Sequence, residues 1–184
     1  MNAPETAVGD MLAALAAVNP GLRYDSEGEV IYRAVRGDKV GLVSGGGSGH
    51  EPAHAGYVGP GMLDAAVAGN VFASPDPTRI LKGIEHADAG KGVLLIIKNY
   101  SGDIMNFELA GELAADMGVE VRSVVVKDDV AVKESTYSTG RRGIAGTVFV
   151  HKLAGARAEA GGTLDEVHAV AQRAADSVRS FGVS

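Results

Sequence analysis

Short apolar runs alternate with helical patterns from residue 38 onward, and this alternation restricts the chain to few folds. Three runs, at 39–43, 92–98 and 119–126, are rich in Val, Leu and Ile and are typical of strands buried on both faces. Strands that alternate with helices form a parallel sheet covered on both sides. The sequence therefore predicts an α/β fold, a three-layer sandwich with a mainly parallel sheet flanked by helices.

Local signals mark the ends of several predicted helices. Pro77 is typical of a first helical position, and Gly118 of the position just after a helix. Thr163 with Glu166 three residues later predicts a capping box. The expected helices span 6–18, 144–160 and 163 to about 180. One more starts at Pro77, and another has Ser101 as a plausible N-cap, apolar residues from 107 to 117 and its end at Gly118.

Composition excludes several classes of protein. The 184 residues suit one ordinary domain, and the absence of cysteine excludes disulfides, thiol nucleophiles and thiolate metal sites. The net charge of −6, with no basic run longer than Arg141-Arg142, argues against a nucleic-acid or anionic-membrane surface. No apolar run approaches the roughly 20 residues that span a bilayer, and no basic cluster precedes 6–18 as in a signal peptide. We expect a cytoplasmic protein with a small-molecule or protein partner.

Glycine is abundant, at 26 of 184 residues, and it is clustered. Nine glycines fall within 41–69, mostly after the first buried strand. Ligands of open α/β sheets bind beyond the carboxyl ends of strands, where glycine lets the backbone approach closely. We expect residues 44–50, Ser-Gly-Gly-Gly-Ser-Gly-His, to form a loop whose N–H groups hold an oxygen-rich ligand. The loop lacks both the P-loop spacing and the third glycine of the dinucleotide fingerprint.

Polar residues follow two of the predicted strands. Lys98 ends the strongest apolar run, and Asp103 lies in the first turn of the next helix, where the helix dipole is expected to keep it ionised. An equally good interpretation is that Asp103 only stabilises the start of this helix. His50 suits hydrogen bonding or proton transfer near neutral pH. The residues alone predict a polar-ligand site with acid–base capacity, built from His50, Gly46, Gly47, Lys98 and Asp103.

Residues 50–54, His-Glu-Pro-Ala-His, match the zinc-protease pattern His-Glu-x-x-His. In that pattern both histidines lie on one helical face, and Pro52 disfavours such a helix. We therefore expect no metal site, keep a zinc hydrolase as a third hypothesis, and expect a structural role for His54.

Three further features allow two interpretations each. Ser74 precedes a predicted helix and either donates to a ligand or caps that helix. The charge pairs Asp128-Asp129 and Arg141-Arg142 are expected at a solvated surface or a dimer contact.

Five ordered segments carry a resemblance to a known family. They include Ser-Gly-Gly-Gly-Ser-Gly-His-Glu-Pro-Ala-His and Ile-Lys-Asn-Tyr-Ser-Gly-Asp-Ile-Met-Asn-Phe. On the evidence of these five segments, nearly the whole chain resembles the substrate-binding K subunit of dihydroxyacetone kinase. The resemblance implies that a short ketose, phosphorylated on a terminal hydroxyl, is held by Gly46, Gly47, Ser74, Lys98 and Asp103, with His50 and Asp103 in proton transfer. The segments lie at 41–54, 72–77, 94–107, 128–133 and 140–148.

The same resemblance implies partners. It implies a homodimer, no cofactor bound by this chain, and a nucleotide-binding subunit or domain that carries ATP or ADP with Mg²⁺, or else a phosphotransferase relay. It leaves open dihydroxyacetone or a longer ketose such as erythrulose as the substrate.

One departure from the family concerns a second domain. Family members carry there a histidine, in a His-Gly-Glu-Pro-like segment, that bonds covalently to the substrate, and residues 1–184 contain no such segment. We expect residues 1–184 to be the N-terminal ketose-binding domain, with the second domain absent and the isolated chain inactive. The alternative is a non-catalytic truncated ketose-binding or regulatory domain that lacks the covalent histidine.

Overall fold

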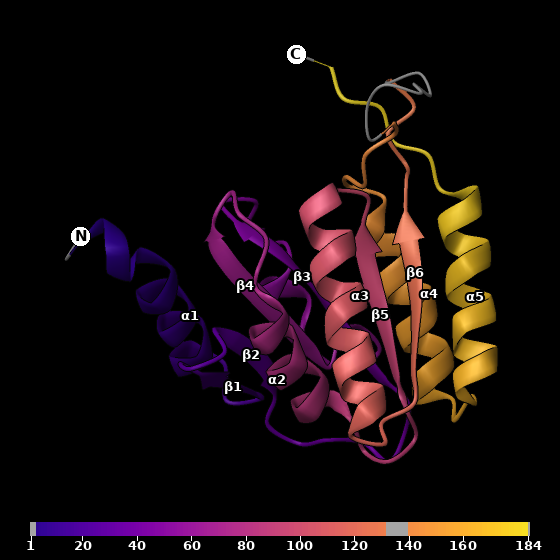
Figure 1. Ribbon diagram of the computed structural model, residues 1–184, viewed down its shortest axis with the longest axis horizontal. Helices are drawn as coiled ribbons and strands as arrows, with labels where there is room; N and C mark the ends of the chain where they lie inside the picture. Colours follow the sequence, from indigo (N-terminus) through magenta and orange to yellow (C-terminus); the bar gives the residue numbers. More distant parts are fainter. Residues whose placement is uncertain (1–2, 132–139, 184) are drawn as a thin grey trace.

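A computed structural model describes residues 3–131 and 140–183 and shows one six-stranded sheet with helices on both faces (Figure 1). The strand order is β1-β2-β4-β3-β5-β6. Strands β4, β3, β5 and β6 run parallel, and β2 is antiparallel to both of its neighbours. The prediction of a mainly parallel α/β sheet is confirmed. The strands are β1 (Leu22–Asp25), β2 (Val30–Arg33), β3 (Gly41–Ser48), β4 (Ala65–Val71), β5 (Val93–Lys98) and β6 (Val121–Val126).

The helices form two outer layers. On one face lie α2 (Pro77–Ala87) and α3 (Ser101–Asp116). On the other lie α1 (Ala7–Val18), α4 (Thr147–Glu159) and α5 (Leu164–Ser177), and two short 3₁₀ helices, η1 (Pro4–Thr6) and η2 (Ala55–Tyr57), complete the described elements. Among the described residues, no helix is long and apolar enough to cross a membrane.

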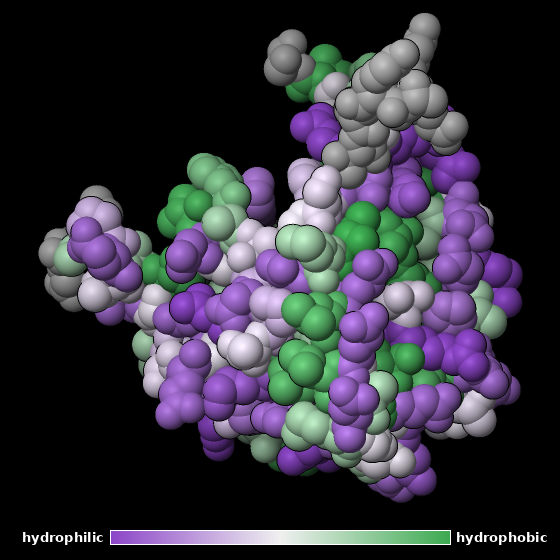
Figure 2. Space-filling view, in the orientation of Figure 1, coloured by the Kyte–Doolittle hydropathy of each residue, from purple (hydrophilic) through white to green (hydrophobic). Residues whose placement is uncertain are grey.

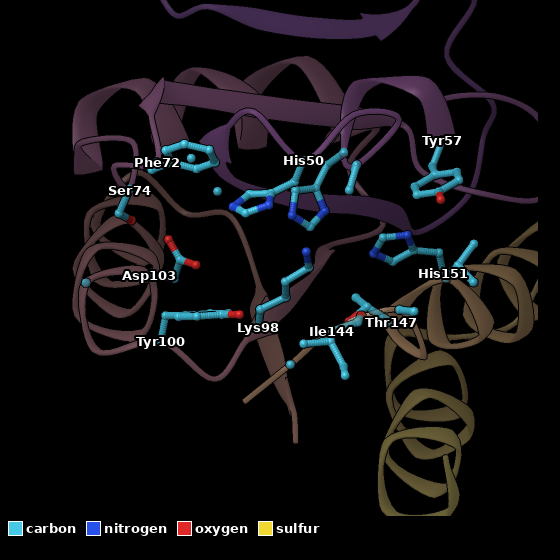
Figure 3. Close-up of a pocket in the computed structure, with 18 residues that line it drawn as sticks. His50, Tyr57, Phe72, Ser74, Lys98, Tyr100, Asp103, Ile144, Thr147 and His151 are labelled. Atoms are coloured by element: carbon cyan, nitrogen blue, oxygen red, sulfur yellow. Dashed lines mark hydrogen bonds between the residues drawn. The ribbon is translucent and has the colours of Figure 1, made fainter. Parts of the chain in front are cut away.

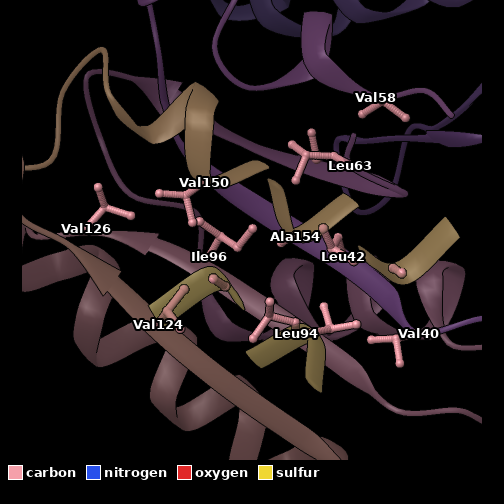
Figure 4. Packing of buried hydrophobic residues seen from close by; sticks show 14 of the residues in the cluster. Val40, Leu42, Val58, Leu63, Leu94, Ile96, Val124, Val126, Val150 and Ala154 are labelled. Carbon is pink, nitrogen blue, oxygen red and sulfur yellow. The ribbon is translucent and has the colours of Figure 1, made fainter. Parts of the chain in front are cut away.

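The central strands supply both cores. Along β5, Leu94 and Ile96 pack with α4 and α5 (Figure 4), whereas Leu95 and Ile97 pack with α2 and α3. Successive side chains of a strand point to opposite faces, so a strand covered on both sides has to be apolar throughout. The continuous apolar run at 92–98 therefore gave a correct strand prediction.

The predicted helix ends are confirmed where a local hydrogen bond or backbone angle sets them. Pro77 opens α2 and Asp76 caps it, and Thr163 with Glu166 forms the capping box of α5. Gly118 follows α3 with a φ of 85°, a conformation that favours glycine.

Other boundaries were wrong. Helix α4 begins three residues later than expected, and α5 ends at Ser177. The start of α3 at Ser101 agrees with the expectation that Asp103 lies in its first turn. The edge strand β1 and its neighbour β2 were missed. Strand β4 was also missed, because its sequence Ala-Ala-Val-Ala-Gly-Asn-Val has weak strand propensity.

The expected glycine loop is largely a strand. Gly45, Gly46 and Gly47 continue β3 and pair in register with β4. A Cβ at Gly45 would lie 2.5 Å from the carbonyl oxygen of Val67. Glycine is needed here because neighbouring chain segments lie directly against the strand, and local sequence does not reveal that contact.

The outer surface is mixed in character. Figure 2 shows hydrophobic areas interrupted by hydrophilic ones on the face that α2 and α3 cover. Exposed apolar side chains here include Met105 and Leu109 on α3 and Met117 just after its end. Scattered exposure of this kind is normal for a folded domain.

Candidate functional site

A cavity of about 630 Å³ opens at the carboxyl ends of the parallel strands. Strand β3 contributes Gly46 and Gly47, β5 contributes Lys98, and α3 contributes Asp103. Chain segments that are distant in sequence meet here because the carboxyl ends of parallel strands share one edge of the sheet. All six residues predicted for the site line the cavity: Gly46, Gly47, His50, Ser74, Lys98 and Asp103.

Asp103 is a buried acid, with 6% of its surface exposed. Burial raises the pKa of its carboxyl, while Ser74, Lys98 and His50 lower it and offset only part of that rise. Removal from water outweighs the charges around the carboxyl, so the pKa of Asp103 lies above its ordinary value. A carboxyl with a raised pKa is a better proton acceptor when it is ionised.

Ser74 precedes α2 but does not cap it, because the Asp76 side chain fills that role. The Ser74 hydroxyl is buried, makes no well-formed hydrogen bond within the described residues, and faces Asp103 across the cavity wall (Figure 3). A buried hydroxyl without a partner favours a bound polar group.

Lys98 carries a cation into the cavity. Figure 3 shows its side chain projecting between Asp103 on one side and His151 on the other. Burial lowers the pKa of the ammonium, and Asp103 and Asp128 act in the opposite direction. Gly143 packs against the backbone of Lys98, so closely that a Cβ at Gly143 would lie 2.8 Å from Lys98 Cα.

His50 lies at the exposed mouth of the cavity, beside an aromatic ring. The rings of His50 and Phe72 are tilted, with centroids 5.1 Å apart. Phe72 has a φ of 55°, in the left-handed region, and its N–H donates to Ser48 O at 2.8 Å. The turn after β4 lies so close that a Cβ at Gly47 would be 2.6 Å from Ala73 N.

Three further residues line the inner wall of the cavity and were not among the predicted site residues: His54, Tyr57 and His151. The ring centroid of His151 lies 5.9 Å from those of both His54 and Tyr57. Burial and Lys98 lower the pKa of His151 to about 3, and neither ring nitrogen has a hydrogen-bond partner among the described residues. Periodicity places His151 on the buried face of a helix, and no local signal distinguishes it from a core residue.

The segment before α4 is held by a buried acid. Asp128 is fully buried and accepts hydrogen bonds from the N–H groups of Ile144 and Gly146, each at 2.7 Å. Asp129 is also buried and pairs with Arg142 at 3.1 Å. The expectation of solvated charge pairs was wrong for both acids, because these contacts join residues from distant segments.

The helical zinc pattern does not form. Residues 50–54 make turns that lead into η2, with His50 exposed and His54 buried. Within 3–131 and 140–183, no group of three His, Asp or Glu side chains is placed to hold a metal ion. The third hypothesis, a zinc hydrolase, has no support from this geometry.

Comparison with known proteins gives consistent matches. The family model described as "Dak1 domain" matches residues 13–184. The chain is 54% identical to the "PTS-dependent dihydroxyacetone kinase 1, dihydroxyacetone-binding subunit DhaK" of Listeria innocua, over all of this chain and 56% of that protein. It is 42% identical to the "DhaKLM operon coactivator DhaQ" of Lactococcus lactis, over 95% of this chain and 54% of that protein. The chain spans about half the length of these relatives.

Solved structures agree with this result. The dihydroxyacetone kinase of C. freundii, in complex with AMP-PNP and Mg²⁺, superposes with a TM-score of 0.88 and 41% identity. The match covers 96% of this chain and 33% of that one.

Proposed function

This chain belongs to the Dak1 domain family, and from that premise we propose that it is the N-terminal part of the dihydroxyacetone-binding subunit of a dihydroxyacetone kinase. Its ligand is dihydroxyacetone or a similar short ketose, which is phosphorylated on a terminal hydroxyl. The observation that carries the proposal is the pairing of a buried carboxyl, Asp103, with a half-buried ammonium, Lys98, on one cavity beside Gly46. The carboxyl can accept from a hydroxyl of one small ligand while the ammonium donates to an adjacent oxygen of the same ligand.

The proposed roles follow from charge and position. The ionised Asp103 accepts the proton of the terminal hydroxyl as its oxygen attacks phosphorus. Lys98 donates to another ketose oxygen, and His50 at the cavity mouth orients the sugar and assists proton transfer. Ser74 donates its hydroxyl to the ligand. Gly46 leaves room for the ligand, and Gly47 lines the cavity where its missing side chain lets the turn after β4 approach.

Other parts of the assembly complete the reaction in this proposal. A nucleotide-binding partner with Mg²⁺, or a phosphotransferase relay, supplies the phosphoryl group, and this chain binds no cofactor itself. A second domain supplies the histidine that bonds covalently to the substrate, and the subunit forms a homodimer in the cytoplasm.

Titration of the isotopically labelled chain with dihydroxyacetone tests the proposal. We expect the amide signals of Gly46, Gly47 and Asp103 to shift, and we expect glycerol, which lacks the carbonyl group, to shift them less. Lys98→Met should abolish the response, whereas Lys152→Met, at an exposed lysine of α4, should retain it. Unchanged spectra at saturating dihydroxyacetone would refute ketose binding by this domain.

A second candidate is a non-catalytic binding or regulatory role. It is favoured by the 42% identity to a protein described as an operon coactivator. The two roles are separated by adding a nucleotide-binding kinase subunit, ATP and dihydroxyacetone to the chain and measuring the phosphorylated product. Product formation that depends on Asp103 excludes the non-catalytic role, and ligand binding without product supports it.

A further inference from the structure

His54 ends a short hydrogen-bonded chain inside the cavity wall. Ser44 Oγ lies 2.7 Å from the carbonyl oxygen of Ile96 and 3.1 Å from Nδ1 of His54. Ser44 is fully buried and His54 is 7% exposed. Ser44 Oγ and His54 Nδ1 are therefore both paired with protein groups.

The chain fixes where the imidazole proton lies. A carbonyl oxygen only accepts, so the single hydroxyl hydrogen of Ser44 is directed to Ile96. Ser44 Oγ then accepts from His54, which requires a hydrogen on Nδ1. Burial and the nearby Lys98 hold the pKa of His54 well below its ordinary value, so the ring is neutral and Nε2 carries a lone pair.

The free nitrogen faces the space above Gly46. A Cβ at Gly46 would lie 3.3 Å from His54 Nε2 and 3.6 Å from Asp103 Oδ2. Nε2 has no hydrogen-bond partner within the part of the chain that the structure describes. Two acceptors, a neutral imidazole nitrogen and a carboxylate oxygen, therefore border the same small volume.

We propose that His54 is a ligand-binding residue whose Nε2 accepts a hydrogen bond from a ketose hydroxyl, across Gly46 from Asp103. The inference rests on the proposed function for the identity of the ligand. It assigns a binding role to a residue that the sequence indicated as structural.

The arrangement selects a substrate class. Asp103 and His54 each accept one hydroxyl hydrogen, and Lys98 donates to an oxygen between them. A ketone with a hydroxyl on each side of the carbonyl group satisfies all three contacts. A monohydroxy ketone such as hydroxyacetone leaves one acceptor unpaired, which costs about the equivalent of one hydrogen bond.

Nitrogen-15 spectra of the histidine rings test the tautomer directly, without any ligand. We expect His54 to show a protonated Nδ1 and an unprotonated Nε2. Ser44→Ala removes the acceptor for Nδ1–H and should increase the fraction of the other tautomer. A wild-type ring protonated at Nε2 overturns the inference whatever the chain binds.

Ligand titration tests the contact itself. Dihydroxyacetone should shift the Nε2 signal of His54, and it should bind roughly 5- to 10-fold more tightly than hydroxyacetone. His54→Leu should reduce that ratio to about 1, and His54→Gln, which retains an acceptor near the Nε2 position, should restore part of it. His168→Gln on α5 is the matched control and should leave the ratio unchanged.

The possible failures are distinct. If dihydroxyacetone shifts Gly46 and Asp103 but leaves the Nε2 signal unmoved, the His54 contact is wrong and the proposed function stands. If no cavity residue responds, the proposed function falls, and the ligand assigned to His54 falls with it. Should His54→Leu fail to fold, the wild-type Nε2 signal still decides the contact.

Discussion

The carboxylate of Asp128 accepts a hydrogen bond from the backbone N–H of Gly146 at 2.7 Å, which ties the chain after β6 to the start of α4. Its second oxygen accepts from Ile144 N, also at 2.7 Å. The cavity residues Thr147 and His151 follow directly on α4. A buried acid outside the cavity thus helps to position one wall of the site.

Asp128→Asn should destabilise the fold. The amide can accept only through one oxygen, and its NH₂ group would then face a backbone donor, so at least one charge-assisted hydrogen bond is lost. We expect the free energy of unfolding in urea to fall by about 2 kcal/mol. Asp116→Asn makes the same chemical change at an exposed position of α3 and should have an effect within about 0.5 kcal/mol. Equal stability of the two variants would contradict this role.

Gly45→Ala should strain the centre of the sheet. The added methyl group would lie 2.5 Å from Val67 O and 3.1 Å from Phe107 Cζ, so β4 or α3 would have to move. We expect a loss of about 1–3 kcal/mol, measured by thermal unfolding. Gly21→Ala is the control, because a Cβ there meets no atom within 4 Å. A Gly45→Ala protein as stable as wild type would show that the strands separate easily.

Asp103→Asn should abolish most catalysis in the complete kinase. Loss of the general base should lower kcat by roughly 10²- to 10⁴-fold in an assay of dihydroxyacetone phosphorylation. Because burial raises the pKa of Asp103, wild-type activity should decline with falling pH above the range of an ordinary aspartate. Glu108→Gln, an exposed acid on the same helix, should retain full activity and the same pH profile. Wild-type turnover by Asp103→Asn would exclude it as the base.

His151 should make stability depend on pH. Its pKa is about 3 in the folded chain against 6.5 for an unperturbed imidazole, so between these limits the unfolded chain binds a proton that the folded chain does not. The contribution of His151 is therefore fully present above pH 6.5 and is lost as pH falls toward 3, by about 1.4 kcal/mol per pH unit at most.

Removing this imidazole separates its effect from those of other groups. His151→Leu should flatten the dependence of unfolding free energy on pH between about 4 and 6, as measured by urea titrations. At pH 7 it should equal or exceed wild-type stability, because an unpaired buried polar group is replaced by an apolar one. His168→Leu should preserve the wild-type slope. An unaltered slope in His151→Leu would mean that the folded chain already accommodates the charged ring.

Agreement between sequence and structure depends on how local each feature is. Residues 93–97 are all apolar because both faces of β5 are covered. Pro77 lies at the start of α2, and Thr163 caps the start of α5. Strand β4 has no such signal, because its pairing with β3 and β2 outweighs weak local propensity.

The amino-acid sequence by itself determined the parallel α/β architecture and the polar residues at its strand ends, because burial on two faces and helix capping leave patterns within a few neighbouring residues. Only the tertiary structure decided that Gly45 to Gly47 are strand, that Asp128 is buried, and that His54 and Asp103 face the same space above Gly46. Each of these depends on the approach of segments far apart in the chain. Such contacts determine which groups lose water and which find partners, and no local spacing encodes them.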